Sequence, residues 1–316
     1  MKTKSILFIL PLCIIMFASC DLDDDSGQPI DPTPTTFEVI SKSENHSILE
    51  QALVDTGLDE ILNSGVYTVF APNDDAFNAI DISGLSNDEI ANILLNHVIN
   101  GNASANDFGN GYIKTNATES YSGDNNFIDM YVNVDGGITL NADASVIEAD
   151  IEASNGTVHV VDTVITLPTV ATLAETNPSF SNLTTALTQE NLLSVLTTTF
   201  DTSPAPFTLF APNDPAFENF IAEDNGFDTI EDILDLAILS DILSYHLLPD
   251  AAVRESEITD GVTPTSIQGE TFTLNTTDGL SITDQNNRVI NITATNITAS
   301  NGVIHVADNI LLPTID

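Results

Sequence analysis

Hydrophobic positions along this chain follow two different periods, and the period changes from helical to strand-like within each half. Apolar side chains recur at helical spacing over residues 37–53 and again over residues 86–100. Ser86 followed by Glu89 predicts a capping box at the start of the second of these helices. The expected strands follow at residues 111–114, 127–134, 137–141, 145–153 and 157–163. Helices followed by strands predict an α+β fold.

The second half of the chain repeats this order. Helical patterns are expected at residues 171–175, 180–196 and 230–248. Short β runs are expected at residues 271–275, 280–283, 289–298 and 303–310. The sequence therefore predicts two domains of the same architecture.

One strand–turn–helix motif occurs once in each half. It reads YTVFAPNDDAF at residues 67–77 and FTLFAPNDPAF at residues 207–217, with a β-branched and aromatic strand at its start. Proline is favoured at the first position of a helix, so Pro215 predicts that Asp214 is an N-cap. By alignment, Asp74 is expected to cap the first copy.

A second motif closes each half, with NGTVHVVD at residues 155–162 and NGVIHVAD at residues 301–308. Asn-Gly between β runs predicts a hairpin with a type I′ turn. The two motifs, in the same order and present twice, resemble the two signature segments of the fasciclin-type domain. The resemblance covers the chain from Thr36 to Pro313. It implies two tandem domains at residues 36–168 and 169–316, each a β-sandwich or wedge with helices packed against it.

The start of the chain is typical of an exported protein. Lys2 and Lys4 precede an apolar run at residues 6–17 that is too short to span a membrane, which predicts a signal peptide over residues 1–19. The sequence Phe-Ala-Ser-Cys that ends at Cys20 resembles a bacterial lipobox with an imperfect first position. In that reading Cys20 carries the lipid. The alternative is an ordinary secretory signal in which Cys20 is incidental.

Residues 20–35 are rich in Asp, Pro, Ser and Gly, which predicts a solvated tether. The acidic run Asp21–Asp25 resembles the surface-export signal of Bacteroidota lipoproteins, although a plain flexible linker accounts for it equally well. In other Gram-negative groups, an aspartate directly after the cysteine instead retains a lipoprotein at the inner membrane. We expect a lipid-anchored protein on the exposed face of the outer membrane.

The charge of the chain excludes one class of function. The sequence has 47 acidic and 6 basic residues, a formal net charge of −41. Nucleic-acid binding requires clustered Lys and Arg, so it is excluded as a main function. The acidic surface is compatible with loosely bound divalent cations. The hydrophobic content of 42% is enough for two cores.

The sequence contains no motif of a metalloprotease, serine hydrolase or phosphate-binding loop and no cysteine nucleophile, so we predict no enzyme and no cofactor. Four histidines form repeat pairs, His97 with His246 and His159 with His305. Two histidines per domain could join a carboxylate on a metal. Their apolar neighbours favour core histidines bonded to backbone instead, and we predict no metal site. His46 has no counterpart and is expected at the surface.

The family resemblance implies one ligand site. In fasciclin-domain matrix proteins of animals, an Asp-Ile pair and a Tyr-His pair flanked by apolar residues are implicated in integrin recognition. The matching residues in the second domain are Asp241, Ile242, Tyr245 and His246. The first domain departs from the pattern, with Asn92 in place of the Asp and Asn96 in place of the Tyr. Alternatively, the spacing of the last three residues within one helical turn places them in the core.

These observations predict a non-catalytic adhesion or binding lipoprotein, whose partner is an unidentified extracellular protein or glycan. The alternative is a carbohydrate-binding or glycan-handling accessory lipoprotein of the outer membrane. The chain has no Trp and only 5 Tyr, which argues against sugar-stacking platforms. An enzyme with an unrecognised set of catalytic groups is a third alternative.

Overall fold

The computed structural model describes residues 33–223 and 226–314, and the described residues after Pro32 belong to one compact unit. The expected signal peptide, Cys20 and the tether up to Pro32 lie outside the described residues.

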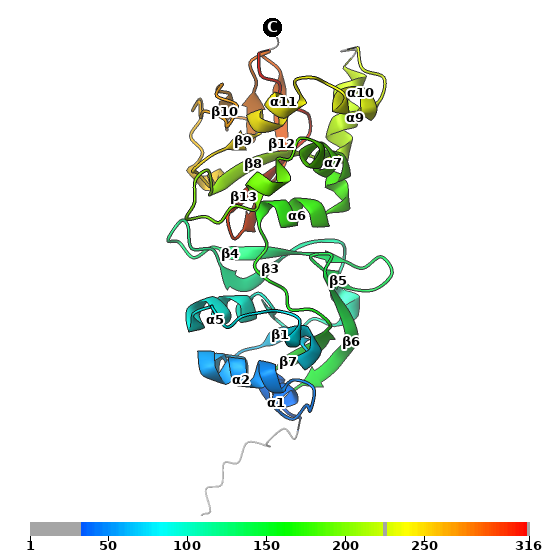
Figure 1. The fold of residues 1–316 in the computed structure, drawn as a ribbon, viewed down its shortest axis with the longest axis vertical. Helices are drawn as coiled ribbons and strands as arrows, with labels where there is room; N and C mark the ends of the chain where they lie inside the picture. Colours follow the sequence, from blue (N-terminus) through cyan, green and yellow to red (C-terminus); the bar gives the residue numbers. More distant parts are fainter. Residues whose placement is uncertain (1–32, 224–225, 315–316) are drawn as a thin grey trace, which may run out of the picture. The chain divides into compact units, whose positions relative to one another are not determined.

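The first domain has helices on one side of its central strands (Figure 1). Its helices are α1 (Thr36–Ser41), α2 (Ser47–Thr56), α3 (Leu58–Ser64), α4 (Asp74–Asn78) and α5 (Asn87–Leu95), with a 3-10 turn at Ala105–Asp107. Its strands are β1 (Tyr67–Pro72), β2 (Val98–Asn100), β3 (Gly111–Thr118), β4 (Phe127–Asn133), β5 (Thr139–Leu140), β6 (Ala144–Ala153) and β7 (Gly156–Val161). The sheet order is β2-β1-β7-β6-β5-β4-β3.

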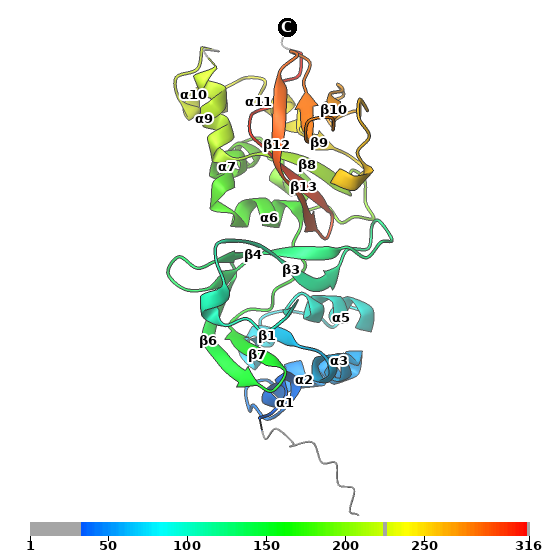
Figure 2. The ribbon, with the colours of Figure 1, turned by 180° about the vertical axis from the view of Figure 1, so that it is seen from behind.

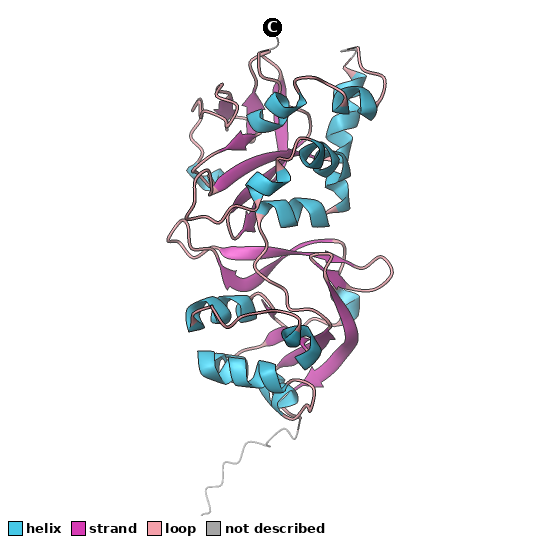
Figure 3. Cartoon of the chain, in the orientation of Figure 1, coloured by secondary structure: helices cyan, strands magenta, loops and turns pink. Residues whose placement is uncertain are grey.

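The second domain repeats this plan, as the view from behind also shows (Figure 2). Its helices are α6 (Val170–Thr176), α7 (Ser181–Gln189), α8 (Leu193–Leu196), α9 (Asp214–Ala222), α10 (Ile230–Leu234) and α11 (Leu239–Tyr245), with 3-10 turns at Pro178–Phe180 and Glu255–Glu257. Its strands are β8 (Phe207–Pro212), β9 (Leu247–Leu248), β10 (Thr273–Asn275), β11 (Ser281–Thr283), β12 (Val289–Ala299) and β13 (Gly302–Ala307). The sheet order is β10-β11-β12-β13-β8-β9. The α+β class is confirmed in both domains (Figure 3).

The two signature motifs of each domain lie side by side in the sheet. β1 runs parallel to β7, with Thr68 opposite Thr157, and β8 runs parallel to β13, with Phe207 opposite Gly302. The other strand pairs are antiparallel, and these central pairs are the exception. A parallel pair requires a long crossover, and here the crossover contains most of the domain.

Three predicted helices are interrupted in the structure. Residues 37–53 form the separate helices α1 and α2, residues 180–196 form α7 and α8, and residues 230–248 form α10, α11 and β9. The helix predicted at residues 86–100 ends early, because Val98 pairs with Val69 at the sheet edge. Its predicted capping box of Ser86 and Glu89 is confirmed.

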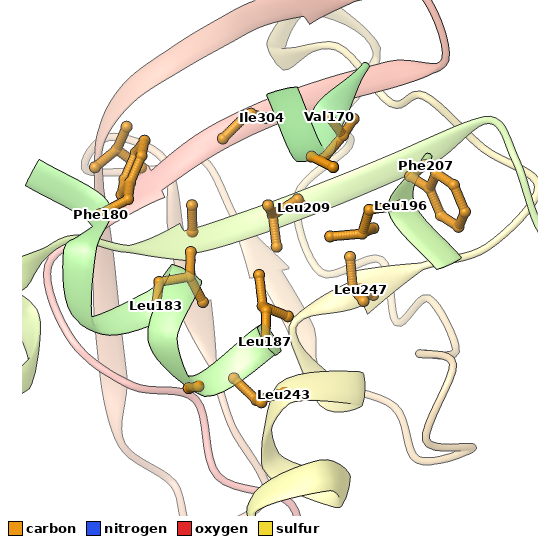
Figure 4. Packing of buried hydrophobic residues seen from close by; sticks show 14 of the residues in the cluster. Val170, Phe180, Leu183, Leu187, Leu196, Phe207, Leu209, Leu243, Leu247 and Ile304 are labelled. Atoms are coloured by element: carbon orange, nitrogen blue, oxygen red, sulfur yellow. The ribbon is translucent and has the colours of Figure 1, made fainter. Parts of the chain in front are cut away.

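The larger hydrophobic cluster of each domain lies between its helices and the central strands, and a second, smaller cluster surrounds Phe70 in the first domain and Phe210 in the second. In the second domain, Leu183 and Leu187 of α7 face Leu209 of β8, and Ile304 of β13 lies beside them (Figure 4). Phe180, at the start of α7, is also fully buried. The first domain has a smaller version of the same cluster around Leu53.

Candidate functional site

The asparagine of the second motif forms hydrogen bonds that connect three segments of its own domain. The side chain of Asn155 accepts a hydrogen bond from the Thr36 amide at 2.8 Å and donates to the carbonyls of Leu62 and Gly65 at 2.6 and 2.8 Å. Asn301 makes the same three bonds in the second domain, each of 2.8 Å. Each asparagine therefore joins the sheet to the start of the first helix and to the segment that enters the central strand.

The glycine of that motif is required by a close approach between strands. The hairpins are present, but the predicted type I′ turn is wrong, because neither Asn155 nor Asn301 has a positive φ. A β-carbon at Gly156 would overlap the carbonyl oxygen of Tyr67, and one at Gly302 would overlap that of Phe207. Gly156 also has a φ of 152°.

In the first motif, the residue that caps the helix is the one before the predicted aspartate. Asn73 is the N-cap of α4, and its side chain accepts the Ala76 amide at 2.8 Å. Asn213 caps α9 in the same way at 3.0 Å. The expectation that Asp74 and Asp214 are these caps is wrong, because each lies at the first helical position, beyond the cap.

The two aspartates instead cap a different helix. The carboxylate of Asp74 accepts the Ser47 hydroxyl at 2.8 Å and the Ile48 amide at 2.9 Å, at the start of α2. Asp214 makes the same pair of bonds at the start of α7, at 2.6 and 2.9 Å. Partial burial opposes ionisation of Asp74, but these hydrogen bonds outweigh it and lower its pKa.

One histidine of each domain connects the end of a helix to the last segment of the domain. His97 Nδ1 lies 2.8 Å from the carbonyl oxygen four residues earlier, and Nε2 accepts the Ile165 amide at 2.8 Å. His246 repeats both contacts and accepts the Leu311 amide at 2.9 Å. Because Nε2 accepts, Nδ1 carries the proton and the ring is neutral. Burial lowers the pKa of both histidines to about 4.

The second pair of histidines lies in β7 and β13. His159 Nε2 lies 3.1 Å from the Ala103 carbonyl oxygen, and its Nδ1 accepts the Asp150 amide at 3.1 Å. His305 Nε2 lies 2.9 Å from the Val253 carbonyl oxygen. Burial lowers the pKa of both rings. All four repeated histidines therefore bond to backbone, as the apolar neighbours predicted.

The four candidate ligand residues divide into one exposed and three buried side chains. Asp241 is exposed at the start of α11, whereas Ile242, Tyr245 and His246 are 2%, 0% and 1% exposed. The Tyr245 hydroxyl donates to the Thr271 carbonyl at 2.8 Å. The alternative that these three residues lie in the core is therefore correct. Of the four residues, only Asp241 has a side chain that a partner could contact.

The first domain uses the corresponding positions for internal bonds. Asn96, in the place of Tyr245, is fully buried and donates to the carbonyls of Ile165 and Thr166 at 3.2 and 3.1 Å. Asn92, in the place of Asp241, donates to the Thr118 carbonyl at 2.8 Å and accepts its amide at 2.9 Å. These contacts explain the departure of the first domain from the pattern.

A buried carboxylate lies where the two domains meet. Asp129 of β4 pairs with Lys114 and accepts the Thr298 amide of β12 at 2.6 Å. Lys114 Nζ also donates to the Asn296 carbonyl at 3.3 Å and lies 3.1 Å from the Thr298 hydroxyl. Burial raises the pKa of Asp129, and the attraction of Lys114 opposes that shift.

Tyr112 of β3 extends the same contact. Its hydroxyl donates to the Leu173 carbonyl of α6 at 2.6 Å, and its ring packs on the core cluster of the second domain and, edge-on, on Tyr131. Burial raises the pKa of Tyr112. These contact residues were not predicted from the sequence. A signal was present, since a basic residue two positions after a tyrosine on one strand face is rare in so acidic a chain.

Two of the cavities among the described residues lie beside elements discussed above. The larger, of about 720 Å³, lies beside α5 and is lined by residues including Leu95, Glu119 and Phe200. The smaller, of about 270 Å³, lies between α1, β6 and β7. His46 lines the smaller cavity and is buried, so its predicted surface position is wrong.

Within residues 33–223 and 226–314, no three His, Cys, Asp or Glu side chains are arranged to hold a metal ion. None of the helices in those same ranges has the length and apolarity needed to cross a bilayer.

The fold and these polar contacts define a protein of two tandem α+β domains, each of which has the same set of polar side chains bonded to backbone. A model of the fasciclin domain matches residues 44–168 and 178–313. The chain therefore belongs to the fasciclin domain family, and the resemblance of its two motifs to that family is confirmed.

Several relatives show how far the similarity extends. Human periostin is 31% identical over 264 residues, which cover 81% of this chain and 29% of periostin. Transforming growth factor-beta-induced protein ig-h3 of Sus scrofa is 30% identical over 264 residues, covering 80% of this chain and 36% of that protein. An uncharacterized protein of Synechocystis is 33% identical over 146 residues, covering 46% of this chain and 98% of its own length. The chain thus spans about a third of the two animal proteins.

A solved structure has the same two-domain fold. The FAS1 domain pair from the insect cell adhesion molecule Fasciclin I matches with a TM-score of 0.51 and 21% sequence identity, covering 84% of this chain and 96% of that one. At this identity the match concerns the fold alone.

Proposed function

We propose that this chain is a non-catalytic adhesion or binding lipoprotein, held by a lipid on Cys20 at the exposed face of a bacterial outer membrane. One observation carries the non-catalytic part. The polar side chains that both domains share, the Asn, Asp and His pairs described above, bond to backbone, and the aspartates also accept the hydroxyl of the first serine of a helix. Groups committed in this way serve the fold, and recognition is left to the surfaces in which the domains differ.

Two further observations support the adhesion role. The chain belongs to the fasciclin domain family, and animal matrix proteins of this family are implicated in integrin recognition. The lipobox resemblance at Cys20 and the acidic tether support display at the cell surface.

The partner class is tested with an array of matrix proteins and glycans probed with the purified protein. Saturable binding to a protein is the expected result. Binding to glycans alone would favour the carbohydrate-binding alternative, and turnover of an arrayed glycan would contradict a non-catalytic role.

The anchor is tested separately with Cys20→Ala. We expect this variant to lose fatty-acid labelling and membrane association. Protease added to intact cells should remove the wild-type protein, and complete protection would place it on the periplasmic face.

A further inference from the structure

Each domain has an equivalent surface beside its first helix, which is covered in the second domain and open in the first. Thr35 and Thr169 are equivalent N-caps of the first helix of each domain, and Ser47 and Ser181 bind equivalent aspartates. Counting between these points places Val39 at the position of Leu173 and Ser43 at that of Asn177. His46 takes the position of Phe180.

In the second domain this surface is occupied. Tyr112 of the first domain donates to the Leu173 carbonyl, and Asn177 lies beside its hydroxyl. Two residues further along β3, Lys114 reaches Asn296 and Thr298 of β12. Residues i and i+2 of a strand point to the same side, so one short Tyr-x-Lys segment makes both contacts.

In the first domain the equivalent surface is open and hollowed. Val39, Ser43 and His46 line the cavity of about 270 Å³ between α1, β6 and β7. The second domain has the bulky Phe180 in the place of His46, fully buried in its core. The smaller imidazole, whose Nδ1 lies 2.7 Å from the Ser43 hydroxyl, leaves room that a phenylalanine ring would fill.

The rim of this cavity carries one exposed apolar side chain and two exposed acids. Ile147 is 56% exposed at its edge, although a large apolar side chain gains by being covered. The positions of Asn296 and Thr298 in the second domain are Asp150 and Glu152 in the first, both exposed acids. Strand β12 binds Lys114 through neutral groups. The equivalent strand of the first domain, β6, has two negative charges at these positions.

We propose that the open surface of the first domain binds an extended segment of a partner protein that carries a tyrosine followed two residues later by Lys or Arg. The tyrosine ring enters the cavity beside Val39 and Ser43, Ile147 covers it, and the basic side chain pairs with Asp150 and Glu152. This names the partner chemistry of the binding role proposed above and rests on it. A second copy of this chain is not the occupant, because its own Tyr112 is buried against its own α6.

The probe is the peptide acetyl-Gly-Tyr-Ile-Lys-Thr-amide, a copy of residues 111–115. Titration into the 15N-labelled protein should shift the amide signals of Ser43, His46 and Ile147 in a saturable way. Replacing the peptide's tyrosine by alanine should abolish the shifts, and replacing its lysine by glutamate should weaken binding at least fivefold.

Protein variants locate the site. Ile147→Ser removes the apolar cover of the tyrosine ring at an exposed position, so it should retain the fold and reduce the affinity at least fivefold. Asp150→Asn with Glu152→Thr copies Asn296 and Thr298. It should weaken the lysine peptide and strengthen the glutamate peptide, because it removes an attraction in the first case and a repulsion in the second. Asp235→Asn, an exposed acid on the second domain, is the matched control and should change nothing.

The absence of saturable shifts at millimolar peptide, or an affinity unaffected by Ile147→Ser, would overturn the site. If adhesion of cells to a protein ligand persisted in either case, the proposed function would stand and only this surface would be wrong. If the peptide bound as described but no cell adhesion were found, the site would stand and the adhesion role would fail.

Discussion

Tyr67 and Gly156 face each other on the parallel strands β1 and β7, so closely that any side chain at position 156 would overlap the Tyr67 carbonyl. The same relationship holds between Phe207 and Gly302 in the second domain. These two contacts join the first signature motif of each domain to the last.

Gly156→Ala and Gly302→Ala should therefore destabilise their domains by more than about 2 kcal/mol, because backbone must move to admit the methyl group. Chemical denaturation measures the loss. Gly84→Ala is the control, since a β-carbon there meets nothing within 4 Å. Equal stability of the Gly84 and Gly156 variants would contradict the close approach.

Asn155→Ala and Asn301→Ala each remove three hydrogen bonds. At about 1 kcal/mol for each bond, the free energy of unfolding should fall by about 3 kcal/mol. Asn219→Ala removes one exposed bond to the Asp308 carbonyl and should cost less than about 1 kcal/mol. A similar small loss of stability in all three variants would mean that the bonds of Asn155 and Asn301 do not stabilise their own domains.

The buried histidines predict a loss of stability in mild acid. His97 and His246 have a pKa of about 4 when folded and the ordinary value of 6.5 when unfolded, so below pH 6.5 the unfolded chain binds protons that the folded chain does not. The contribution of these two histidines to the free energy of unfolding is therefore fully present above pH 6.5 and declines as the pH falls toward 4. Between pH 7.5 and 5 the loss is about 2 kcal/mol for each histidine.

The comparison of His97→Gln with the wild type tests this assignment. The variant is expected to be less stable at neutral pH, but its melting temperature should change less between pH 7.5 and 5. An unchanged slope would show that the ring is not responsible.

Two residues of helix α11 can be tested for different roles, Tyr245 in the core and Asp241 in binding. Tyr245→Phe loses the bond to Thr271 and should lower the free energy of unfolding by about 1 kcal/mol, whereas Asp241→Ala should stay within about 0.5 kcal/mol of the wild type. If Asp241 contacts a ligand, Asp241→Ala weakens adhesion at unchanged melting temperature. Adhesion that is lost with Tyr245→Phe but kept with Asp241→Ala would rule out the exposed acid as the contact.

The sequence predicted the order of elements because the periodicity of apolar residues follows burial directly. It failed where tertiary contacts compete with local preference. Val98 has helical neighbours but pairs with Val69 in the sheet, so the predicted helix stops at Leu95. Asp74 has the chemistry of a cap for α4, but α2 is close enough in space to take its carboxylate.

The candidate sites show the same limit. Helical spacing alone cannot distinguish a core face from a binding face, and α11 presents Tyr245 to the core. The open surface around His46 was not predictable from one domain. It becomes visible only when the covered position of Tyr112 on the other domain is known.

The parallel pairing of β1 with β7, and of β8 with β13, also has a consequence for the order of folding. Each of β1 and β8 lacks its parallel neighbour until nearly the whole domain has been synthesised, since that neighbour is the last strand of the domain. Pairings of such long sequence separation form late and slowly. We expect a nascent chain to stay unfolded until residues 156–161 and then 302–307 emerge. In the exported protein proposed above, this delay would keep each domain unfolded for its passage through a secretion channel.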